Sequence, residues 1–266
     1  MRLAAALQVV GRRNTSTIVF LKQVMMSAGS TLAPGEAHLW QIHLLGTEDE
    51  IRRGRSVLSE DEIQRADRFH FERHRSSFIV AHSALRKILS AYLNVAPQQV
   101  AFCYGPQGKP DLSGPLEQSG IKFNLSHSGD YGLLAVTQGH TLGVDIERIN
   151  HEFGTEEIAT RFFSAGEIET LRAVPPAGKA EAFFSCWTRK EAYIKAAGGG
   201  LSIPLDSFDV AFGPGVRPAL LRVQVAAHEH WKLYDLTAPK GYAAALVIEG
   251  EEHRIQYFVF EQAVHF

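Results

Sequence analysis

The sequence predicts an α+β fold, and three observations support this prediction. Strand-type and helix-type patterns are both frequent, the pattern returns to strands after a long helical stretch, and two distant segments are weakly similar to each other. The chain has 266 residues, of which 45% are hydrophobic and 21% are charged. This composition is typical of a globular protein, and the length suits one large domain or two closely packed halves.

Charge, cysteine content and hydropathy exclude several classes of protein. A formal net charge of -2 gives no electrostatic reason to expect nucleic acid or an anionic membrane as the main partner. Cys103 and Cys186 are too few for a disulfide framework, so we expect buried thiols in a reducing compartment. No stretch approaches the roughly 20 apolar residues of a membrane span. We therefore expect a soluble, cytoplasmic protein.

The start of the chain is unusual because it contains basic residues but no acidic residue before Glu36. Such a start is typical of an organelle-targeting peptide. The alternative is an over-extended start with Met25 or Met26 as the true initiator, since residues 33–35 would form a turn just before the first strand. In both interpretations residues 1–35 are an extension outside the fold.

Strand and helix patterns follow one another in the first part of the chain. Residues 38–45 are rich in strand-type side chains. A capping signal at Ser59 begins a helix that runs to Arg68, and apolar residues recur at helical spacing over residues 76–93. After a turn-dense loop come three short strands, at residues 121–125, 132–137 and 142–146.

The second part of the chain begins with helices and ends with strands. Helices are predicted at residues 156–163, 164–174 and 180–197, and a run of three glycines stops the last one. The tail returns to strands at residues 207–212, 223–225, 231–236, 242–249 and 254–260.

The weak internal similarity aligns residues 131–147 with residues 242–258 without gaps. Each segment is predicted to be a strand, a glycine-containing turn and a second strand, which is the pattern of a β-hairpin. The identical pairs are Tyr131/Tyr242, Val136/Val247 and Gly139/Gly250. These identities indicate either a duplicated α+β unit or chance. A duplication would divide the folded region into halves at residues 36–139 and 140–266.

Two carboxylates alternate with apolar residues at the end of one predicted strand. Asp145 and Glu147 in the sequence GVDIE lie on the same face because side chains in a strand alternate. Carboxylates held this close repel one another, and a hard divalent cation such as Mg²⁺ relieves the repulsion. The alternative is a strand face that is acidic and exposed without a function.

One face of the predicted helix 180–197 combines charged and apolar side chains. Trp187, Lys190, Glu191, Ile194 and Lys195 share this face. Glu191 would be a third metal ligand, and Lys195 a cation directed at a phosphate. The alternative is an exposed i, i+4 pair, which stabilises a helix by only about 0.3–0.5 kcal/mol.

Several further residues are candidates for binding an anion. Ser126 and His127 follow an apolar strand at the start of a polar loop, where they would hold an anion or only close the turn. Lys109, in a Gly/Pro loop, and Arg65, in a basic stretch, are candidates for phosphate contacts. No nucleophile elbow of the Gly-x-Ser-x-Gly type accompanies the Ser-His pair, so a hydrolase triad is not indicated.

Taken together, these segments resemble the Sfp-type 4'-phosphopantetheinyl transferases, which convert apo carrier proteins to their holo form. The combination of G-[VI]-D-x-E with W-x-x-K-E-[SA]-x-x-K about forty residues further on is highly specific. The resemblance runs in order from Arg65 to Phe208. It rests on the FxFxxxR region near 69–75, GKP (108–110), FNLSHSG (123–129), GVDIE (143–147), RFFSAGE (161–167) and WTRKEAYIKAAGGGLSIPLDSF (187–208).

The resemblance implies a pseudo-dimer of two similar α/β halves with coenzyme A in the cleft between them. By the same resemblance, three residues match the Mg²⁺ ligands, namely Asp145, Glu147 and Glu191. The residues that match contacts to coenzyme A and its phosphates are Arg65, Lys109, Ser126, His127, Asp145 and Lys195. Lys190 and Trp187 match motif positions with a partly structural role. Mn²⁺ is a possible substitute for Mg²⁺, and a monomer is expected.

The resemblance also implies a reaction. A serine of an apo acyl or peptidyl carrier protein would attack the β-phosphorus of coenzyme A and release adenosine 3',5'-bisphosphate. Glu191, alone or through a bound water, is the candidate base, with Lys195 also acting at the phosphates. Two alternatives are a metal-dependent nuclease or phosphohydrolase, and a coenzyme A-binding or carrier-docking module without activity. The sequence leaves open which carrier is served.

Overall fold

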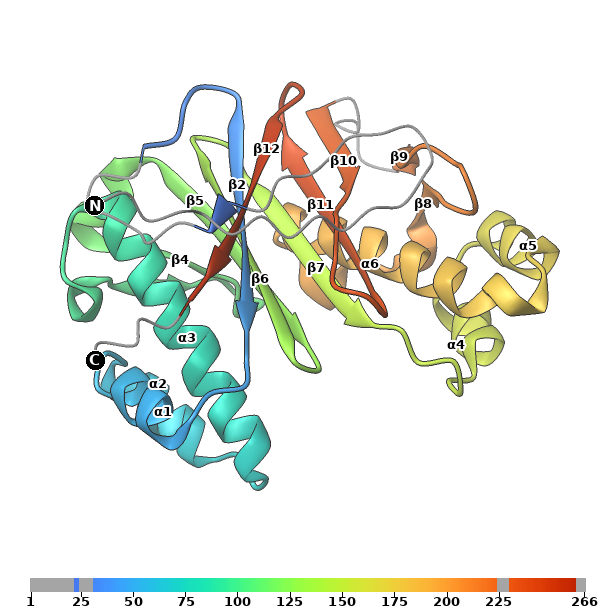
Figure 1. Cartoon of the computed structure of the whole chain (residues 1–266). Helices are drawn as coiled ribbons and strands as arrows, with labels where there is room; N and C mark the ends of the chain where they lie inside the picture. Colours follow the sequence, from blue (N-terminus) through green and yellow to red (C-terminus); the bar gives the residue numbers. More distant parts are fainter. Residues whose placement is uncertain (1–21, 24–30, 224–229, 262–266) are drawn as a thin grey trace.

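The computed structural model of the chain describes residues 22–23, 31–223 and 230–261 (Figure 1). Its strands are β1 (Lys22–Gln23), β2 (Glu36–His43), β3 (Phe102–Tyr104), β4 (Pro110–Leu112), β5 (Ile121–Ser128), β6 (Tyr131–Gln138), β7 (Leu142–Arg148), β8 (Phe208–Ala211), β9 (Ala219–Val223), β10 (Trp231–Asp235), β11 (Tyr242–Glu249) and β12 (Arg254–Phe260). Its α-helices are α1 (Glu48–Arg55), α2 (Glu60–Asp67), α3 (Glu72–Leu93), α4 (Thr155–Phe162), α5 (Ala165–Ala173) and α6 (Lys179–Ala197).

Two sheets form the centre of the molecule, and one long helix covers the outer face of each (Figure 1). The larger sheet has the order β1-β12-β2-β6-β5, and the smaller one the order β10-β11-β7. Helix α3 packs on the larger sheet in one apolar cluster, and α6 packs on the smaller sheet in another. A third cluster joins the two sheets face to face.

The period of two along each strand assigns its side chains to these layers. On β6, Leu133 belongs to the core between the sheets, whereas Leu134 belongs to the core under α3. On β7, Leu142, Val144 and Ile146 all belong to the core between the sheets. The intervening residues of β7 therefore face the side on which α6 lies.

Local signals explain where the helices begin and end. Ser59 with Glu62 forms a capping box at the start of α2, and Ser164 with Glu167 forms another at the start of α5. Helix α6 ends at Gly198, whose φ of 72° is readily adopted only by glycine. Capping boxes and a C-terminal glycine therefore mark these helix ends in the sequence.

The predicted α+β fold with two similar halves is confirmed, and most predicted elements are present to within a few residues. Helix α1 and the short strands β3 and β4 were not predicted. Residues 224–225 of the predicted strand 223–225 lie outside the described residues. The division of the chain at residues 139 and 140 stays a prediction, because β12 from the C-terminal side belongs to the sheet of the N-terminal side.

The two predicted hairpins are wrong as hairpins, although all four of their strands exist. Strand β6 pairs with β2 and β5, while β7 pairs with β11. Strand β11 pairs with β7 and β10, while β12 crosses back and pairs with β2 in parallel. The glycine turns therefore carry the chain from one sheet to the other, and the crossing strands join the halves.

The exclusion of residues 1–35 from the fold does not hold for the described part of that segment. Lys22 and Gln23 form β1, which pairs in parallel with the outer edge of β12. Leu32 packs against the core under α3. The open edge of β12 and the apolar core account for these contacts. Most of the segment, including Met25 and Met26, lies outside the described residues.

None of the described helices is both long enough and apolar enough to cross a membrane.

Candidate functional site

Three carboxylates from β7 and α6 form an acidic group. Asp145 and Glu147 share the face of β7 that lies towards α6, as their spacing predicted. Asp145 is almost fully buried, with 2% of its surface exposed, whereas Glu147 and Glu191 are half-buried. The negative charges of Asp145 and Glu147 both act on Glu191. The acidic residues predicted from separate motifs are thus brought together by the fold.

Lys195 and Ser126 contact one oxygen of Asp145. The Lys195 ammonium lies 2.5 Å from Asp145 Oδ1, and Ser126 donates a hydrogen bond to the same oxygen at 2.9 Å. Lys195 Nζ also donates to Ser126 Oγ at 3.0 Å. The other oxygen, Asp145 Oδ2, is buried and has no hydrogen-bond partner among the described residues. A buried carboxylate oxygen without a partner is costly unless a donor or a cation reaches it.

Alternate residues of β5 fasten the acidic end of β7. Asn124 Oδ1 accepts the Val144 N–H at 2.8 Å. Two positions on, Ser126 binds Asp145, and two further on, Ser128 donates to Glu147 Oε2 at 2.7 Å. The sequence analysis predicted that Ser126 binds an anion, and it did not predict these three hydrogen bonds between β5 and β7. The alternation of polar residues in NLSHS was the available signal.

Gly143 allows α6 to approach β7 closely. A Cβ atom at this position would overlap main-chain atoms of Ala192, Lys195 and Ala196. A side chain would therefore push α6 away from the strand. The glycine of the GVDIE motif is thus what brings Lys195 within reach of Asp145.

Burial and mutual repulsion raise the pKa values of two carboxylates. Burial, followed by the charge of Asp145, raises the pKa of Glu191 from 4.5 to about 7. Burial also raises the pKa of Glu147, against the opposing effect of the hydrogen bond from Ser128. Both shifts are characteristic of carboxylates that share a site without enough positive charge.

The chemistry of the donors suits a hard divalent cation. The group offers carboxylate oxygens, which Mg²⁺ prefers, and one of them, Asp145 Oδ2, lacks a partner in the described structure. Within the described ranges, however, no three His, Cys, Asp or Glu side chains are already arranged as a metal centre. The cation beside Asp145 is the Lys195 ammonium. The predicted Mg²⁺ ligation by Asp145, Glu147 and Glu191 stays a prediction.

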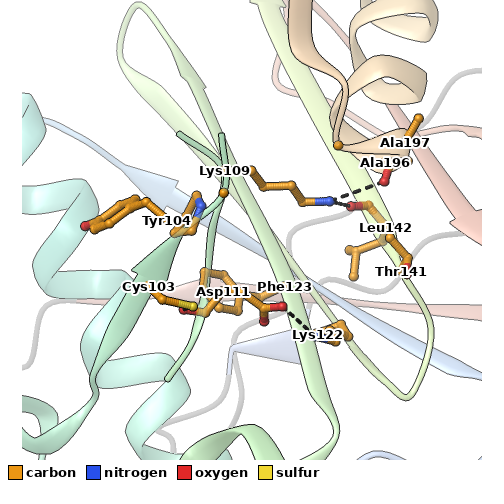
Figure 2. A pocket seen from close by; sticks show the side chains of 13 residues that line it. Cys103, Tyr104, Lys109, Asp111, Lys122, Phe123, Thr141, Leu142, Ala196 and Ala197 are labelled. Atoms are coloured by element: carbon orange, nitrogen blue, oxygen red, sulfur yellow. Dashed lines mark hydrogen bonds and ion pairs between the residues drawn. The ribbon is translucent and has the colours of Figure 1, made fainter. Parts of the chain in front are cut away.

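Lys109 lies at the C-terminal end of α6, in the position shown in Figure 2. Its ammonium donates to the main-chain oxygens of Lys195 at 2.7 Å, Leu142 at 2.9 Å and Ala196 at 3.4 Å. Burial lowers the pKa of Lys109 from 10.5 to about 8. A cation in this place satisfies the last carbonyls of a helix and stabilises it by up to about 2 kcal/mol. The predicted phosphate contact of Lys109 stays a prediction.

The remaining two anion candidates share one neighbourhood. Arg65 is exposed on α2, and its guanidinium lies 5.4 Å from the centre of the Phe78 ring. His127 is exposed, yet desolvation by the surrounding protein lowers its pKa, as do the nearby charges of His82, Lys195 and Arg65. Positive side chains from different elements therefore converge near Ser126.

Lys190 has a structural environment. It is fully buried and donates to the main-chain oxygens of Phe208 at 2.6 Å and Leu205 at 2.7 Å. Its ammonium also lies 2.8 Å from Glu167 Oε2. Lys190 thus connects α6 to α5 and to the segment before β8, and Trp187 packs against the same core.

A cavity of about 390 Å³ lies beside the acidic group rather than over it. Lys109, Tyr104, Lys122 and the end of α6 line it, as Figure 2 shows, whereas none of the three carboxylates does. Lys122 pairs with Asp111 at 2.5 Å. The cavity therefore borders the predicted site through Lys109 and α6.

Comparisons with known families and relatives point in one direction. A model described as "4'-phosphopantetheinyl transferase superfamily" matches residues 141–247, and one described as "4'-phosphopantetheinyl transferase, N-terminal" matches residues 45–139. The 4'-phosphopantetheinyl transferase HetI of Nostoc sp. is 40% identical over 220 residues, which cover 83% of this chain and 90% of that relative. The 4'-phosphopantetheinyl transferase Sfp of Bacillus subtilis is 30% identical over 62% of this chain and 70% of its own length.

Solved structures with partial similarity include two from smaller proteins. The Thermotoga maritima holo-[acyl-carrier-protein] synthase is 19% identical, with a TM-score of 0.35, over 42% of this chain and 63% of that one. A "Chronobacterium ammoniagenes ACPS-CoA complex" is 22% identical, with a TM-score of 0.32, over 42% of this chain and 98% of that one. Both similarities cover less than half of this chain.

Proposed function

Because this chain belongs to the 4'-phosphopantetheinyl transferases, in the Sfp-type branch of the superfamily, we propose that it transfers the 4'-phosphopantetheine group of coenzyme A to a serine of an apo carrier protein. Phosphopantetheinyl transfer is the activity named for its relatives. Because the relatives are named as transferases, the family membership favours this activity over the two alternative hypotheses, a nuclease and an inactive binding module. The carrier protein, the dependence on Mg²⁺ and the individual residue roles are parts of the proposal.

The observation that carries this proposal is the convergence of β7, α6 and β5 at Asp145. An acidic group of Asp145, Glu147 and Glu191 lies beside Lys195, and the positive charge of Arg65 acts on His127, which follows Ser126 on β5. Such a combination of carboxylates and cations suits the binding of a pyrophosphate together with a divalent ion. We assign the ion to Asp145, Glu147 and Glu191, with Mg²⁺ as the natural metal and Mn²⁺ as a substitute.

The proposed transfer balances as a single displacement. The carrier serine Oγ forms a bond to the β-phosphorus, and the bond from this phosphorus to the bridging oxygen breaks. Adenosine 3',5'-bisphosphate leaves, and the serine proton passes to Glu191, directly or through water. Lys195 offsets the charge that grows on the leaving phosphate. The bound cation, when present, supplies further stabilisation of that charge.

The nucleotide contacts are assigned to residues around the acidic group. Ser126 and His127 on β5, with Arg65 on α2, would hold the phosphates and the ribose side of coenzyme A. Lys109 belongs to the same predicted set, although its ammonium already has main-chain acceptors. A monomeric state and a cytoplasmic location stay predictions.

Mass spectrometry tests the activity directly. The purified chain is mixed with coenzyme A, Mg²⁺ and apo carrier proteins of fatty acid, polyketide and peptide synthesis. We expect at least one carrier to gain the mass of phosphopantetheine, with adenosine 3',5'-bisphosphate released in equal amount. No gain with any carrier in the panel would contradict the proposed function.

The metal assignment is tested with Glu147→Ala. We expect transfer to fall about 100-fold, because a ligand on β7 is lost. Binding of Mn²⁺, measured by electron paramagnetic resonance without coenzyme A, should weaken in parallel. The matched control is Glu157→Ala, which removes an exposed glutamate of α4. A Glu147→Ala variant with normal activity and normal Mn²⁺ binding would remove Glu147 from the ligand set.

A further inference from the structure

The end of α6 is fixed at one point by a residue from the other half of the chain. Lys109 comes from the loop between β3 and β4, and its ammonium donates to the main-chain oxygens of Leu142, Lys195 and Ala196. Leu142 is the first residue of β7, and the other two acceptors lie in the last turn of α6. An ammonium group has three hydrogens, so these acceptors account for all of them.

The same point is where the helix and the strand come closest. Gly143, next to Leu142, lies against the main chain of Ala192, Lys195 and Ala196. A cation at the C-terminal end of a helix also opposes its negative dipole end, and burial strengthens this attraction. Lys109 therefore holds the last turn of α6 to the first residues of β7 (Figure 2).

This attachment bears directly on Lys195. Its carbonyl oxygen binds Lys109 at 2.7 Å, while its side chain reaches Asp145 Oδ1 at 2.5 Å and Ser126 Oγ at 3.0 Å. A shift of the last helical turn would move the Lys195 ammonium relative to the carboxylates. Errors of about 1 Å in the position of a reacting group reduce rates up to about 100-fold.

We propose that Lys109 is a positioning residue, which anchors the end of α6 on β7 and so holds Lys195 beside Asp145. This inference rests on the proposed function, since that function gives Lys195 its role at the phosphates. It differs from the phosphate contact predicted for Lys109 from sequence resemblance. A residue that binds the 3'-phosphate would act on substrate affinity, whereas a residue that positions Lys195 acts on turnover.

Two substrates separate these roles. Lys109→Met is assayed with coenzyme A and with 3'-dephospho-coenzyme A, using one apo carrier. We expect kcat to fall about 10- to 100-fold for both substrates, with KM for each within about twofold of the unaltered enzyme. A rise in KM for coenzyme A alone would show a phosphate contact and overturn the proposal. Unchanged kcat with both substrates would also overturn it.

Lys122 provides the matched control, because it lines the same cavity but its ammonium pairs with Asp111, as Figure 2 shows. We expect Lys122→Met to keep kcat within about twofold of the unaltered enzyme. A fall in kcat equal to that of Lys109→Met would show that loss of charge in the cavity, rather than the anchor on α6, is responsible.

Lys109→Arg decides the question if Lys109→Met does not fold. Arginine binds phosphates well, so a phosphate contact would survive this change with nearly normal kcat and KM. A planar guanidinium cannot direct three hydrogen bonds from a single nitrogen to the three carbonyl oxygens that Lys109 binds. The positioning role therefore predicts a reduced kcat with a normal KM. Normal kinetics of Lys109→Arg would overturn the proposal.

Hydrogen–deuterium exchange tests the anchor without any turnover. We expect the amides of residues 192–198 to exchange about 10-fold faster in Lys109→Arg or Lys109→Met than in the unaltered chain, and at an unchanged rate in Lys122→Met. Unchanged exchange in the Lys109 variants would overturn the anchor. If the unaltered chain modified no carrier, the proposed function would fail while this exchange result still stood.

Discussion

Asp145 and Gly143 lie on the same face of β7, and both are needed for the contact of Lys195 with this strand. The carboxylate of Asp145 is buried against α6, and the missing side chain of Gly143 lets the helix come close enough for Lys195 to reach it. Single residues at this contact are therefore sensitive to volume as well as to charge. The next residue along the face, Glu147, is held by Ser128.

Replacement of Gly143 by alanine is expected to damage both stability and transfer. The added methyl group meets main-chain atoms that cannot rotate away, so α6 must move. We expect a loss of about 1–3 kcal/mol in the free energy of unfolding and a clear drop in kcat, measured by urea denaturation and the mass assay. The control is Gly166→Ala on α5, where a methyl group meets nothing within 4 Å. Equal effects of the two changes would contradict the close-contact explanation.

Glu62 is a second residue with an unusual environment. It is 2% exposed and binds Arg86 at 2.6 Å and His82 at 3.0 Å, besides closing the capping box of α2. Burial alone would raise its pKa, but the hydrogen bonds from His82, the Ser59 N–H and Arg86 outweigh it and lower the pKa from 4.5 to about 2. The folded state therefore favours the ionised carboxylate.

This lowered pKa predicts an acid-sensitive part of the stability. The contribution of Glu62 is fully present above pH 4.5, its ordinary pKa, and is lost as the pH falls towards its folded-state pKa of about 2. The shift corresponds to about 3 kcal/mol. We expect Glu62→Gln to be less stable at neutral pH and to lose less further stability in acid, as measured by urea denaturation at several pH values. Glu169→Gln, which removes an exposed carboxylate of α5, is the control, and identical pH profiles of the two variants would refute the prediction.

At the scale of the element, helix α6 presents different chemistry on its different sides. One side packs in the core on the smaller sheet, a second side carries Glu191 of the acidic group together with Lys195, and Lys190 points into the protein towards α5. The sequence WTRKEAYIK therefore mixes structural and functional residues at adjacent positions. Lys190 and Glu191 are neighbours in the chain but have unrelated surroundings.

The buried pair of Lys190 and Glu167 is expected to be a stability element rather than part of the reaction. Lys190→Met leaves Glu167 and two carbonyl oxygens without their partner, so we expect a loss of about 3–5 kcal/mol in the free energy of unfolding. In a double-mutant cycle with Glu167→Gln, the combined loss should fall short of the sum by about 1–3 kcal/mol. Strict additivity would show that the two residues do not interact.

The Lys190→Met variant also tests whether Lys190 takes part in substrate binding. The Lys190 ammonium binds Glu167 and the main-chain oxygens of Leu205 and Phe208, so folded Lys190→Met should keep its KM for coenzyme A. A large rise in KM without loss of stability would show instead that Lys190 takes part in substrate binding.

At the scale of the whole molecule, β12 joins the two similar halves. It comes from residues 140–266 but pairs in parallel with β2 of residues 36–139, while β7 pairs with β11 within residues 140–266. Each half also contains a capping-box glutamate that forms a buried ion pair with a basic residue of its long helix. The pairs are Glu62 with Arg86 and Glu167 with Lys190. These parallels support the internal repeat, while the acidic group occurs on β7 and α6 and has no counterpart in the aligned positions.

The pairing of β12 with β2 predicts that neither half folds alone. Residues 36–139 expressed by themselves lack β12 beside β2 and expose the apolar face that meets the other sheet. We expect this fragment and the fragment 140–266 to show no cooperative unfolding separately by circular dichroism, and to regain it when mixed. Cooperative unfolding of the isolated fragment 36–139 would contradict the prediction.

Local sequence patterns predicted most of the helices and strands and the three residues of the acidic group. Alternation along residues 143–147 placed Asp145 and Glu147 on one face, helical spacing placed Glu191 with Lys195, and a cap and a glycine run marked the start of α2 and the end of α6. These properties depend on neighbours within one or two turns, so local patterns were sufficient. The resemblance of the combined motifs then pointed to the family that the relatives confirm.

The contacts between distant elements could be read only from the folded chain. The pairing of β7 with β11, the hydrogen bonds from β5 to β7 and the attachment of Lys109 to the end of α6 join residues far apart in the chain. Sheet pairing and close packing depend on the shape of the complete core, which no local pattern records. For that reason Lys109 was predicted as a phosphate contact, while its anchoring contacts and the space left by Gly143 became visible only in the folded chain.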